Sequence, residues 1–372
     1  WHQQNSVYGH KLYDVIQKNL YASLMFERKW GEWHSLSTGL SFNYDNYRQR
    51  LRADQIPDAE PERMKEMEAV PGAYVQYSFN YDTRLLIMAG LRYDHSSRWG
   101  SMVTPRFHLK WNPREEFSVH ASAGRGFRTP HVMAENNYVL ASSRRVVIAN
   151  DLTQEDAWNF GAGANTFLPL FDRTLNLGVE YYYTYFRHQM LADFDADPHE
   201  VRFTDLKGRS YSHTLQVEAT YHVISDLTAT LAYRYTDMKA DYGLGLVEKP
   251  LTGRWKGLLT LSYTPMMGLW QADVTLAING GGRMPAPYIM ADGFQSWAPR
   301  YKAFPQLNAQ LTRNFRHWAV YVGGENLTGF RQKNPIVAAS APWSNEFDAT
   351  MVYGPLHGAI IYAGFRYTFT KY

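Results

Sequence analysis

Residues 175–185 read LNLGVEYYYTY, and this stretch decides the fold. Every second position from Leu175 to Tyr185 is apolar or tyrosine, whereas the positions between them include Asn176, Glu180 and Thr184. Successive side chains of a β-strand point to opposite faces, so the alternation gives one apolar face and one mostly polar face. A helix, with its period of 3.6 residues, would spread both sets around its surface. The stretch therefore predicts a strand that lies between two different environments.

The same alternation is found along much of the chain. It recurs in residues 85–93, 214–221, 227–236 and 270–279. The apolar faces often end in Tyr or Trp, as expected where a transmembrane β-barrel meets the membrane interface. The other faces carry charged residues that we expect to face a polar lumen: Arg92, Glu180, Glu218, Arg234, Asp273 and Arg366. Alternation alone leaves a soluble β-sandwich open, but a sandwich would have to bury the tyrosine-ended faces against each other.

The composition also favours a membrane barrel. The 372 residues include 27 Tyr, 19 Phe and 11 Trp but no Cys, and the mean hydropathy is −0.43. No stretch reaches the ~18 consecutive apolar residues that a spanning helix needs. The 38 basic and 35 acidic residues nearly cancel, which argues against nucleic acid as a partner. We find no nucleophile elbow, phosphate-binding loop, dinucleotide fingerprint or zinc spacing, so we expect neither an enzyme nor a cofactor.

Short turns and long loops alternate along the chain. We expect short turns near Trp30-Gly31, 81–83, 112–114, 169–172, 225–226, 265–268 and 314–316. Longer connections are expected at 51–68, 127–154, 188–200, 238–252, 280–300 and 328–356, with a short one near 96–100. Outer-membrane barrels have short periplasmic turns and longer external loops. The rhythm predicts an all-β fold, a transmembrane antiparallel up-and-down barrel with about sixteen strands, and no internal domain boundary.

Several motifs resemble those of TonB-dependent receptors. Residues 126–130, Gly-Phe-Arg-Thr-Pro, resemble the family's G-F-R-x-P motif. Residues 150–155 resemble its N-P-x-L-x-P-E segment, although Asp151 and Gln154 replace the two prolines. Residues 325–328, Glu-Asn-Leu-Thr, resemble a stretch of the penultimate strand, and the loop 334–355 resembles that of Bacteroides-like members. The last strand is rich in aromatic residues, as in the family, and its terminal aromatic is either Phe369 or Tyr372.

The resemblance implies a function and partners. Family members have an N-terminal plug and a barrel of about 22 strands, so residues 1–372 would be the C-terminal portion of the barrel, without the plug. It implies an outer-membrane protein of a Gram-negative bacterium that imports an iron chelate, haem, cobalamin or a similar large solute. Its partners would be a bulky solute, outer-membrane lipid and lipopolysaccharide, a surface lipoprotein, and the TonB–ExbB–ExbD complex, which would act through the plug. A passive porin with a self-contained barrel of about sixteen strands is the alternative.

Candidate ligand contacts lie in the predicted external loops. They are Arg128, His131, Arg144, Arg145, Met284, Tyr288 and Trp297. Arginines suit an anionic solute or lipopolysaccharide phosphates, while aromatic and Met side chains suit a bulky ligand or a partner lipoprotein. The plainer interpretation is that the arginines and the histidine are solvated and that 283–300 packs on itself above the barrel rim.

An acidic run in the same region raises the question of calcium. Asp193, Asp195 and Asp197 have the spacing that starts a calcium-binding loop. Pro198 stands where such a loop needs Gly, and Thr204 stands where it needs the closing Glu. We therefore expect a solvated loop and assign no metal site, with these aspartates as the candidates if calcium binds in another geometry.

Overall fold

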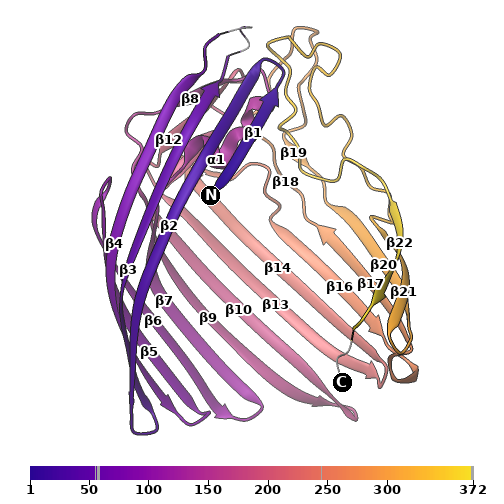
Figure 1. Cartoon of the computed structure of the whole chain (residues 1–372). Helices are drawn as coiled ribbons and strands as arrows, with labels where there is room; N and C mark the ends of the chain where they lie inside the picture. The colour runs from indigo at the N-terminus through magenta and orange to yellow at the C-terminus, as the bar shows by residue number, and fades with distance from the viewer. Residues whose placement is uncertain (55, 57–58, 244, 370–372) are drawn as a thin grey trace.

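The computed structural model describes residues 1–54, 56, 59–243 and 245–369. One large antiparallel sheet curls around most of a barrel, and the long connections gather at one end of it (Figure 1). Four positions of the predicted loops 51–68 and 238–252, namely 55, 57, 58 and 244, lie outside the described residues, as does Tyr372. Among the described residues, no helix combines the length and hydropathy needed to cross a bilayer.

The sheet contains 17 strands. They are β1 (His2–Tyr8), β2 (Lys11–Trp30), β3 (His34–Arg52), β4 (Glu62–Tyr81), β5 (Leu85–Ser96), β6 (Gly100–Arg114), β7 (Phe117–Arg128), β9 (Glu155–Leu170), β10 (Arg173–His188), β13 (Ser210–Ile224), β14 (Leu227–Asp241), β15 (Leu246–Glu248), β16 (Trp255–Tyr263), β17 (Trp270–Asn279), β20 (Phe304–Asn314), β21 (Trp318–Glu325) and β22 (Ile360–Tyr367). Because β15 and β16 both pair with β14, they form one interrupted pass, which leaves the sixteen passes that the sequence predicts.

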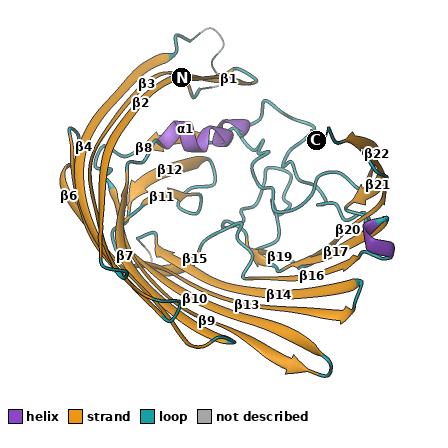
Figure 2. Ribbon diagram, turned by 60° about the horizontal axis from the view of Figure 1, so that its bottom comes forward, coloured by secondary structure: helices purple, strands orange, loops and turns teal. Residues whose placement is uncertain are grey.

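Successive passes of the sheet pair antiparallel, which confirms the up-and-down topology. The two edges of the sheet are not joined: among the described residues, β1 pairs only with β2, and β22 pairs only with β21. Figure 2 shows the sheet curving around an interior, with β1 and β22 at its two ends. The sheet is thus barrel-like without being closed.

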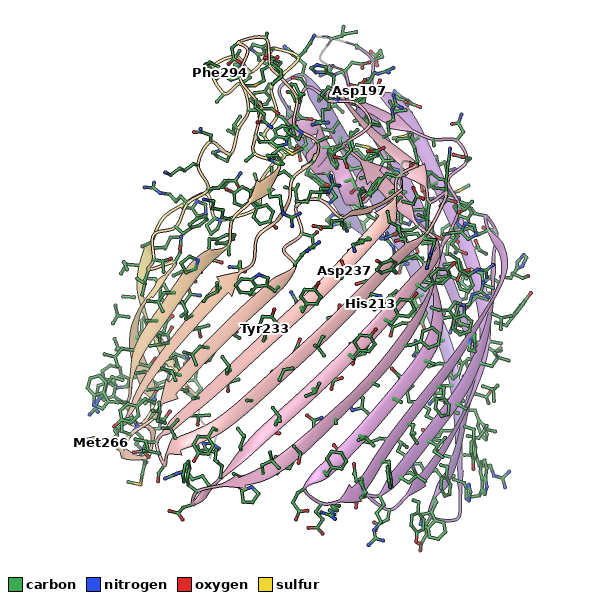
Figure 3. All side chains as sticks on the ribbon, turned by 180° about the vertical axis from the view of Figure 1, so that it is seen from behind. Asp197, His213, Tyr233, Asp237, Met266 and Phe294 are labelled. Atoms are coloured by element: carbon green, nitrogen blue, oxygen red, sulfur yellow. The ribbon has the colours of Figure 1, made fainter. Side chains whose placement is uncertain are left out.

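The register confirms the two-faced strands. Val179 lies opposite Val217, whereas Glu180 lies opposite Gln216, which in turn lies opposite Arg234. Apolar side chains therefore meet on the convex face and polar ones on the concave face. Figure 3 shows the convex face from behind, with Tyr233 and His213 on it.

The turns follow the prediction with two differences. The tight turn after β6 lies at 115–116, because β6 continues through 112–114 with an irregular register. The loop at 51–68 is shorter than expected, because β3 runs to Arg52 and β4 starts at Glu62. β2, β3 and β4 contain 20, 19 and 20 residues. Since a bilayer needs only about 9–11 residues of a tilted strand, these strands project well beyond an apolar band.

Four long connections form a folded unit, here called the cap, which consists of residues 129–154, 189–209, 280–303 and 326–359. Its elements are α1 (Val132–Asn136), η1 (Asn137–Ala141), β8 (Arg145–Ile148), β11 (Met190–Asp193), β12 (Glu200–Asp205), β18 (Gly282–Arg283) and β19 (Arg300–Tyr301). β12 pairs antiparallel with β11 and parallel with β8. Figure 2 shows α1, β8, β11 and β12 on the concave side of the sheet. The predicted loops are therefore structured and turn into the barrel mouth.

Candidate functional site

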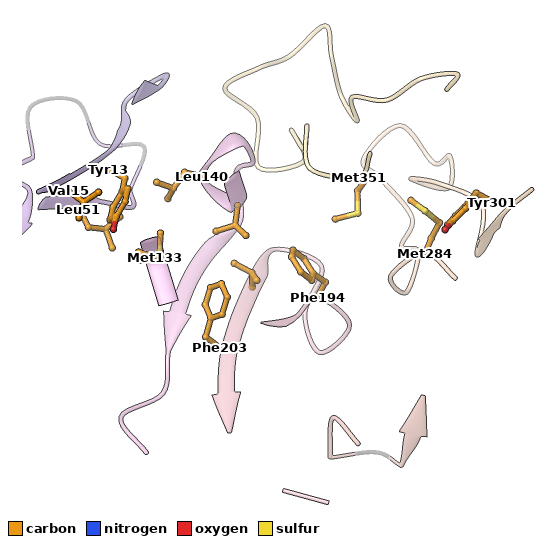
Figure 4. Close-up of a cluster of buried hydrophobic side chains, with 12 residues drawn as sticks. Tyr13, Val15, Leu51, Met133, Leu140, Phe194, Phe203, Met284, Tyr301 and Met351 are labelled. Carbon is orange, nitrogen blue, oxygen red and sulfur yellow. The ribbon is translucent and has the colours of Figure 1, made fainter. Parts of the chain in front are cut away.

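The cap has its own hydrophobic core at the barrel mouth (Figure 4). Val139, Leu140, Val201 and Phe203 are essentially inaccessible to solvent. Tyr13 of β2 joins them, so the core also contacts the barrel wall. Burying a side chain of this size contributes about 1.5–3 kcal/mol. The cap is therefore a packed structure with a defined shape and not a set of solvated loops.

A buried ion pair fastens distant parts of the cap to one another. The Arg144 Nε lies 2.9 Å from an Asp348 carboxylate oxygen, and both side chains are less than 5% exposed. Arg144 also donates to the backbone carbonyls of Phe194 and Glu200, at 3.3 and 3.0 Å. The expectation that Arg144 is a solvated loop charge is therefore wrong: in this arrangement its donors are used within the protein.

A buried lysine fastens the cap to β2. The Lys11 ammonium donates to the backbone carbonyls of Ser142 and Arg144, both at 2.8 Å. Burial lowers the pKa of Lys11 to about 8, although the charges of Asp54 and Asp348 act in the opposite direction. These bonds hold residues 142–144, which follow η1 directly, against β2 of the wall. The backbone of Arg144 is thus fixed by Lys11, while its side chain binds Asp348.

His131 forms a second contact between cap and wall. Its Nδ1 lies 3.1 Å from a Glu66 carboxylate oxygen, and its ring stacks on Tyr47 with centroids 4.1 Å apart. Glu66 also accepts from Arg98 and Gln49, at 2.9 and 2.7 Å. Burial raises the pKa of Glu66, but the hydrogen bonds from His131, Arg98 and Gln49 outweigh it and lower this pKa to about 2. The first turn of α1 is thereby held over β3 and β4.

Two of the predicted arginines are exposed and paired with carboxylates. Arg128, at the end of β7, bridges Glu135 of α1 and Glu155 of β9. Arg145 pairs with Glu200 across the parallel β8–β12 contact. Both remain accessible on the cap, unlike Arg144.

The aromatic loop 283–300 packs largely on itself. Met284 is buried in the cap core, and the indole N–H of Trp297 donates to the Pro285 carbonyl at 2.8 Å. The Tyr288 ring meets the Trp297 ring edge-on at 5.7 Å. Phe294, at the tip, is 72% exposed (Figure 3). Met284 and Trp297 thus serve the cap, while Tyr288 remains partly accessible.

The three aspartates point to separate partners. Asp193 is buried and accepts the backbone N–H of Asp195 and Ala196, at 2.8 and 3.1 Å. Asp195 binds the Arg283 guanidinium through both carboxylate oxygens, at 3.1 and 2.8 Å. Asp197 accepts the backbone N–H of His199. The described residues contain no group of three or more His, Asp or Glu side chains arranged to hold a metal ion.

Two adjoining cavities lie on the concave face of β3–β7. The upper one, of ≈ 560 Å³, has Arg128, His131 and Glu135 in its lining. The lower one, of ≈ 400 Å³, is here called the arginine pocket. Its polar side chains are Ser37, Tyr74, Gln76, Arg92, Thr104, Arg106 and Arg125. Arg92, Thr104, Arg106 and Arg125 line both cavities, so the pocket continues downward from the space under the cap.

The sequence predicts only Arg92 among the arginines of this pocket as a lumen residue. Pro105 interrupts the apolar alternation around Arg106, and Arg125 lies in a stretch of Ala, Ser and Gly with little contrast between its faces. The alternation of side chains between the two faces of β5 and β6 is the signal that could have identified Arg106. Arg92 lies opposite Thr104, which places Arg106 on the same face two residues further along.

Comparison with known proteins identifies the family. The model for "TonB dependent receptor-like, beta-barrel" matches residues 2–327. No curated protein matches the sequence. Among solved structures, the fold is similar to the copper transporter OprC (14% identity, TM-score 0.71, covering 96% of this chain and 57% of that one). It is also similar to the FrpB iron transporter from Neisseria meningitidis (14%, 0.66, 96% and 55%) and the siderophore receptor PirA from Acinetobacter baumannii (14%, 0.65, 96% and 55%). The chain spans little more than half the length of these proteins, and it belongs to the family of TonB-dependent receptor β-barrels.

Proposed function

We propose that this chain is the C-terminal part of the barrel of an outer-membrane importer that takes up a scarce, large solute. The solute is bound from outside by the cap and admitted through a plug under the control of TonB, ExbB and ExbD. The observation that carries this proposal is the cap itself. Its packed core and its ties to the wall, through Lys11 and His131, give the barrel mouth a fixed shape suited to specific recognition.

The open edges of the sheet support the proposal that the complete barrel contains further strands. The strand β2 is paired along its whole length with β3, but β1 covers only its first part, up to Gln17. Unpaired backbone groups cost several kcal/mol each in a bilayer, so a sheet that ends there is not stable in lipid. We infer that additional strands lie between β2 and β22 in the complete receptor and that a plug occupies its lumen. The lengths of the similar structures support this inference.

Two of the predicted contacts, Arg128 and His131, line the upper cavity. Tyr288 is partly exposed in the aromatic loop 283–300, where its ring contacts those of His199 and Trp297. We propose these residues, with Arg145, as ligand contacts. Arg144, Met284 and Trp297 would act indirectly, by holding the cap in shape. Lipopolysaccharide around the barrel and a lipoprotein on the exposed Phe294 tip are further proposed partners. No catalytic role is proposed.

A first experiment separates the importer from a porin. The mature polypeptide that contains this sequence would be isolated from outer membranes, and its mass would be compared with 43.0 kDa. Cells with and without TonB would then be tested for uptake of iron chelates, haem and cobalamin. A much larger polypeptide and TonB-dependent uptake of one solute are expected. A mass near 43.0 kDa with TonB-independent passage of small solutes would establish the porin instead.

A further inference from the structure

We propose that the arginine pocket binds a multivalent oxyanion, a carboxylate- or phosphate-bearing group of the imported solute. The proposal rests on the proposed importer function and places a second contact point below the cap, on the barrel wall. The polar lining of the pocket carries Arg92, Arg106 and Arg125, and no Asp or Glu of the described chain lines it.

Arg106 is the cation available to a ligand. No carboxylate or hydrogen-bond acceptor contacts its guanidinium within the described part of the chain. Its cross-strand neighbours are Gly90 on β5 and Gly124 on β7, so no side chain lies directly opposite it on either strand. A Cβ at Gly90 would meet its nearest atom at 3.6 Å, which is ordinary contact. Gly90 is therefore not required for close packing of the strands, and there is room for a side chain or a ligand beside Arg106.

The two flanking arginines are held in place from outside the pocket. Arg92 binds Asp94 through Nε and a terminal nitrogen, at 2.7 and 2.6 Å. Arg125 binds Asp156 in the same two-point manner, at 2.9 and 2.8 Å. Such paired hydrogen bonds fix the plane of a guanidinium. Both flanking arginines are thus oriented, Arg92 by its own carboxylate and Arg125 by Asp156, which also pairs with Arg187 at 3.3 Å. Arg106 has no carboxylate partner among the described residues.

The size and the other polar groups indicate a small solute group as the occupant. A volume of ≈ 400 Å³ is within the range of small-molecule sites and is much larger than a single carboxylate requires. The hydroxyls of Tyr74 and Thr104 and the amide of Gln76 add neutral donors around the arginines. Arginine forks match the geometry of carboxylate and phosphate oxygens. These features together favour an anion with several oxygens.

The test uses the complete receptor, purified in detergent, with citrate and inorganic phosphate as probes and glucose as a neutral control. Binding would be measured by calorimetry for the wild type, Arg106→Gln and Gly90→Glu. The second substitution places a carboxylate beside Arg106 at a position with room for it. We expect at least one anionic probe to bind the wild type, and both substitutions to weaken that binding by about tenfold or more. Glucose should not bind.

Two matched variants complete the design. Gly90→Ala fills the same space without charge, and Lys256→Gln removes a cation of the concave face that lies opposite Arg234, away from the pocket. Neither should change the affinity by more than about twofold. The proposal is overturned if the wild type binds neither anion, if Arg106→Gln and Gly90→Glu bind as the wild type does, or if Lys256→Gln weakens binding equally. Because this binding needs no TonB, failure of the pocket and failure of TonB-dependent uptake are separate results.

Discussion

Replacing Arg144 by Met removes one half of the buried pair with Asp348 while keeping much of the side-chain volume. The Asp348 carboxylate is about 4% exposed, so it would be left charged without its partner in the cap. Breaking a buried pair in this way costs about 3–5 kcal/mol. The barrel wall is made of other contacts and should be unaffected, so this cost acts on the folded cap alone.

Amide hydrogen exchange in the cap measures this cost. A change of about 1.4 kcal/mol alters an opening equilibrium tenfold, so 3–5 kcal/mol corresponds to an increase in opening of about a hundredfold to a few thousandfold. The increase should appear in η1, β8 and β12. The amides of β9 and β10 in the barrel wall should keep their protection.

Arg145→Met is the matched control, because it changes the next residue in the same way. The Arg145 side chain is 69% exposed, and Glu200, which is 10% exposed, would keep its 2.7 Å hydrogen bond from Arg202. Exposed pairs contribute about 0–1 kcal/mol, so exchange should increase fivefold at most. If the two substitutions give the same exchange, or if Arg144→Met leaves the cap as protected as the wild type, the role assigned to Arg144 is refuted.

Three further outcomes are expected. The pKa of Glu66 is lowered from 4.5 to about 2, so its stabilisation of the cap is complete above pH 4.5 and is lost as the pH falls through 2. Amide hydrogen exchange at α1 should rise as the pH falls over this window, and Glu66→Gln should remove the pH dependence. Phe203→Ala, at a fully buried site, should destabilise the cap by about 3–5 kcal/mol, measured as faster proteolysis of the surface loops in intact cells. His120 and Glu180 are in contact on the concave face, with Nε2 and a carboxylate oxygen 2.9 Å apart. Gly163→Ala would place a Cβ 2.6 Å from the His120 ring and 2.7 Å from Glu180, so we expect it to separate these two side chains and to lower the thermal unfolding temperature of the barrel.

The wall could be predicted from the sequence because its rule is local. Alternation at 175–185 places Val179 and Glu180 on opposite faces, and the register places each beside a residue of its own kind. Turns could be predicted in the same way where Pro, Gly or Asp marks them: Pro169 and Asp172 flank Phe171, which takes a positive φ of 54° in the turn between β9 and β10.

The cap could not be predicted, because its contacts are not local. Arg144 sits among polar residues and was expected to be solvated, but its ion-pair partner is 204 residues away. The parallel contact of β8 with β12 likewise joins segments that look like separate loops in the sequence. Arg106 was missed for a different reason, since Pro105 interrupts the alternation around it and only the pairing of β6 with β5 places it on the concave face.

The same difference in range has a consequence for the order of assembly. Each hairpin of the wall joins neighbours in sequence, whereas the contacts of Arg145 with Glu200 and of Arg144 with Asp348 close loops of 55 and 204 residues. Closing a longer loop costs more entropy, and distant contacts form slowly. Since Asp348 follows β21, the cap can be completed only after 21 of the 22 described strands have been synthesised, and we expect their local pairs to form before this distant contact. A newly inserted barrel would therefore pass through a stage with an open mouth, and the cap would mature last, on a scaffold already in the membrane.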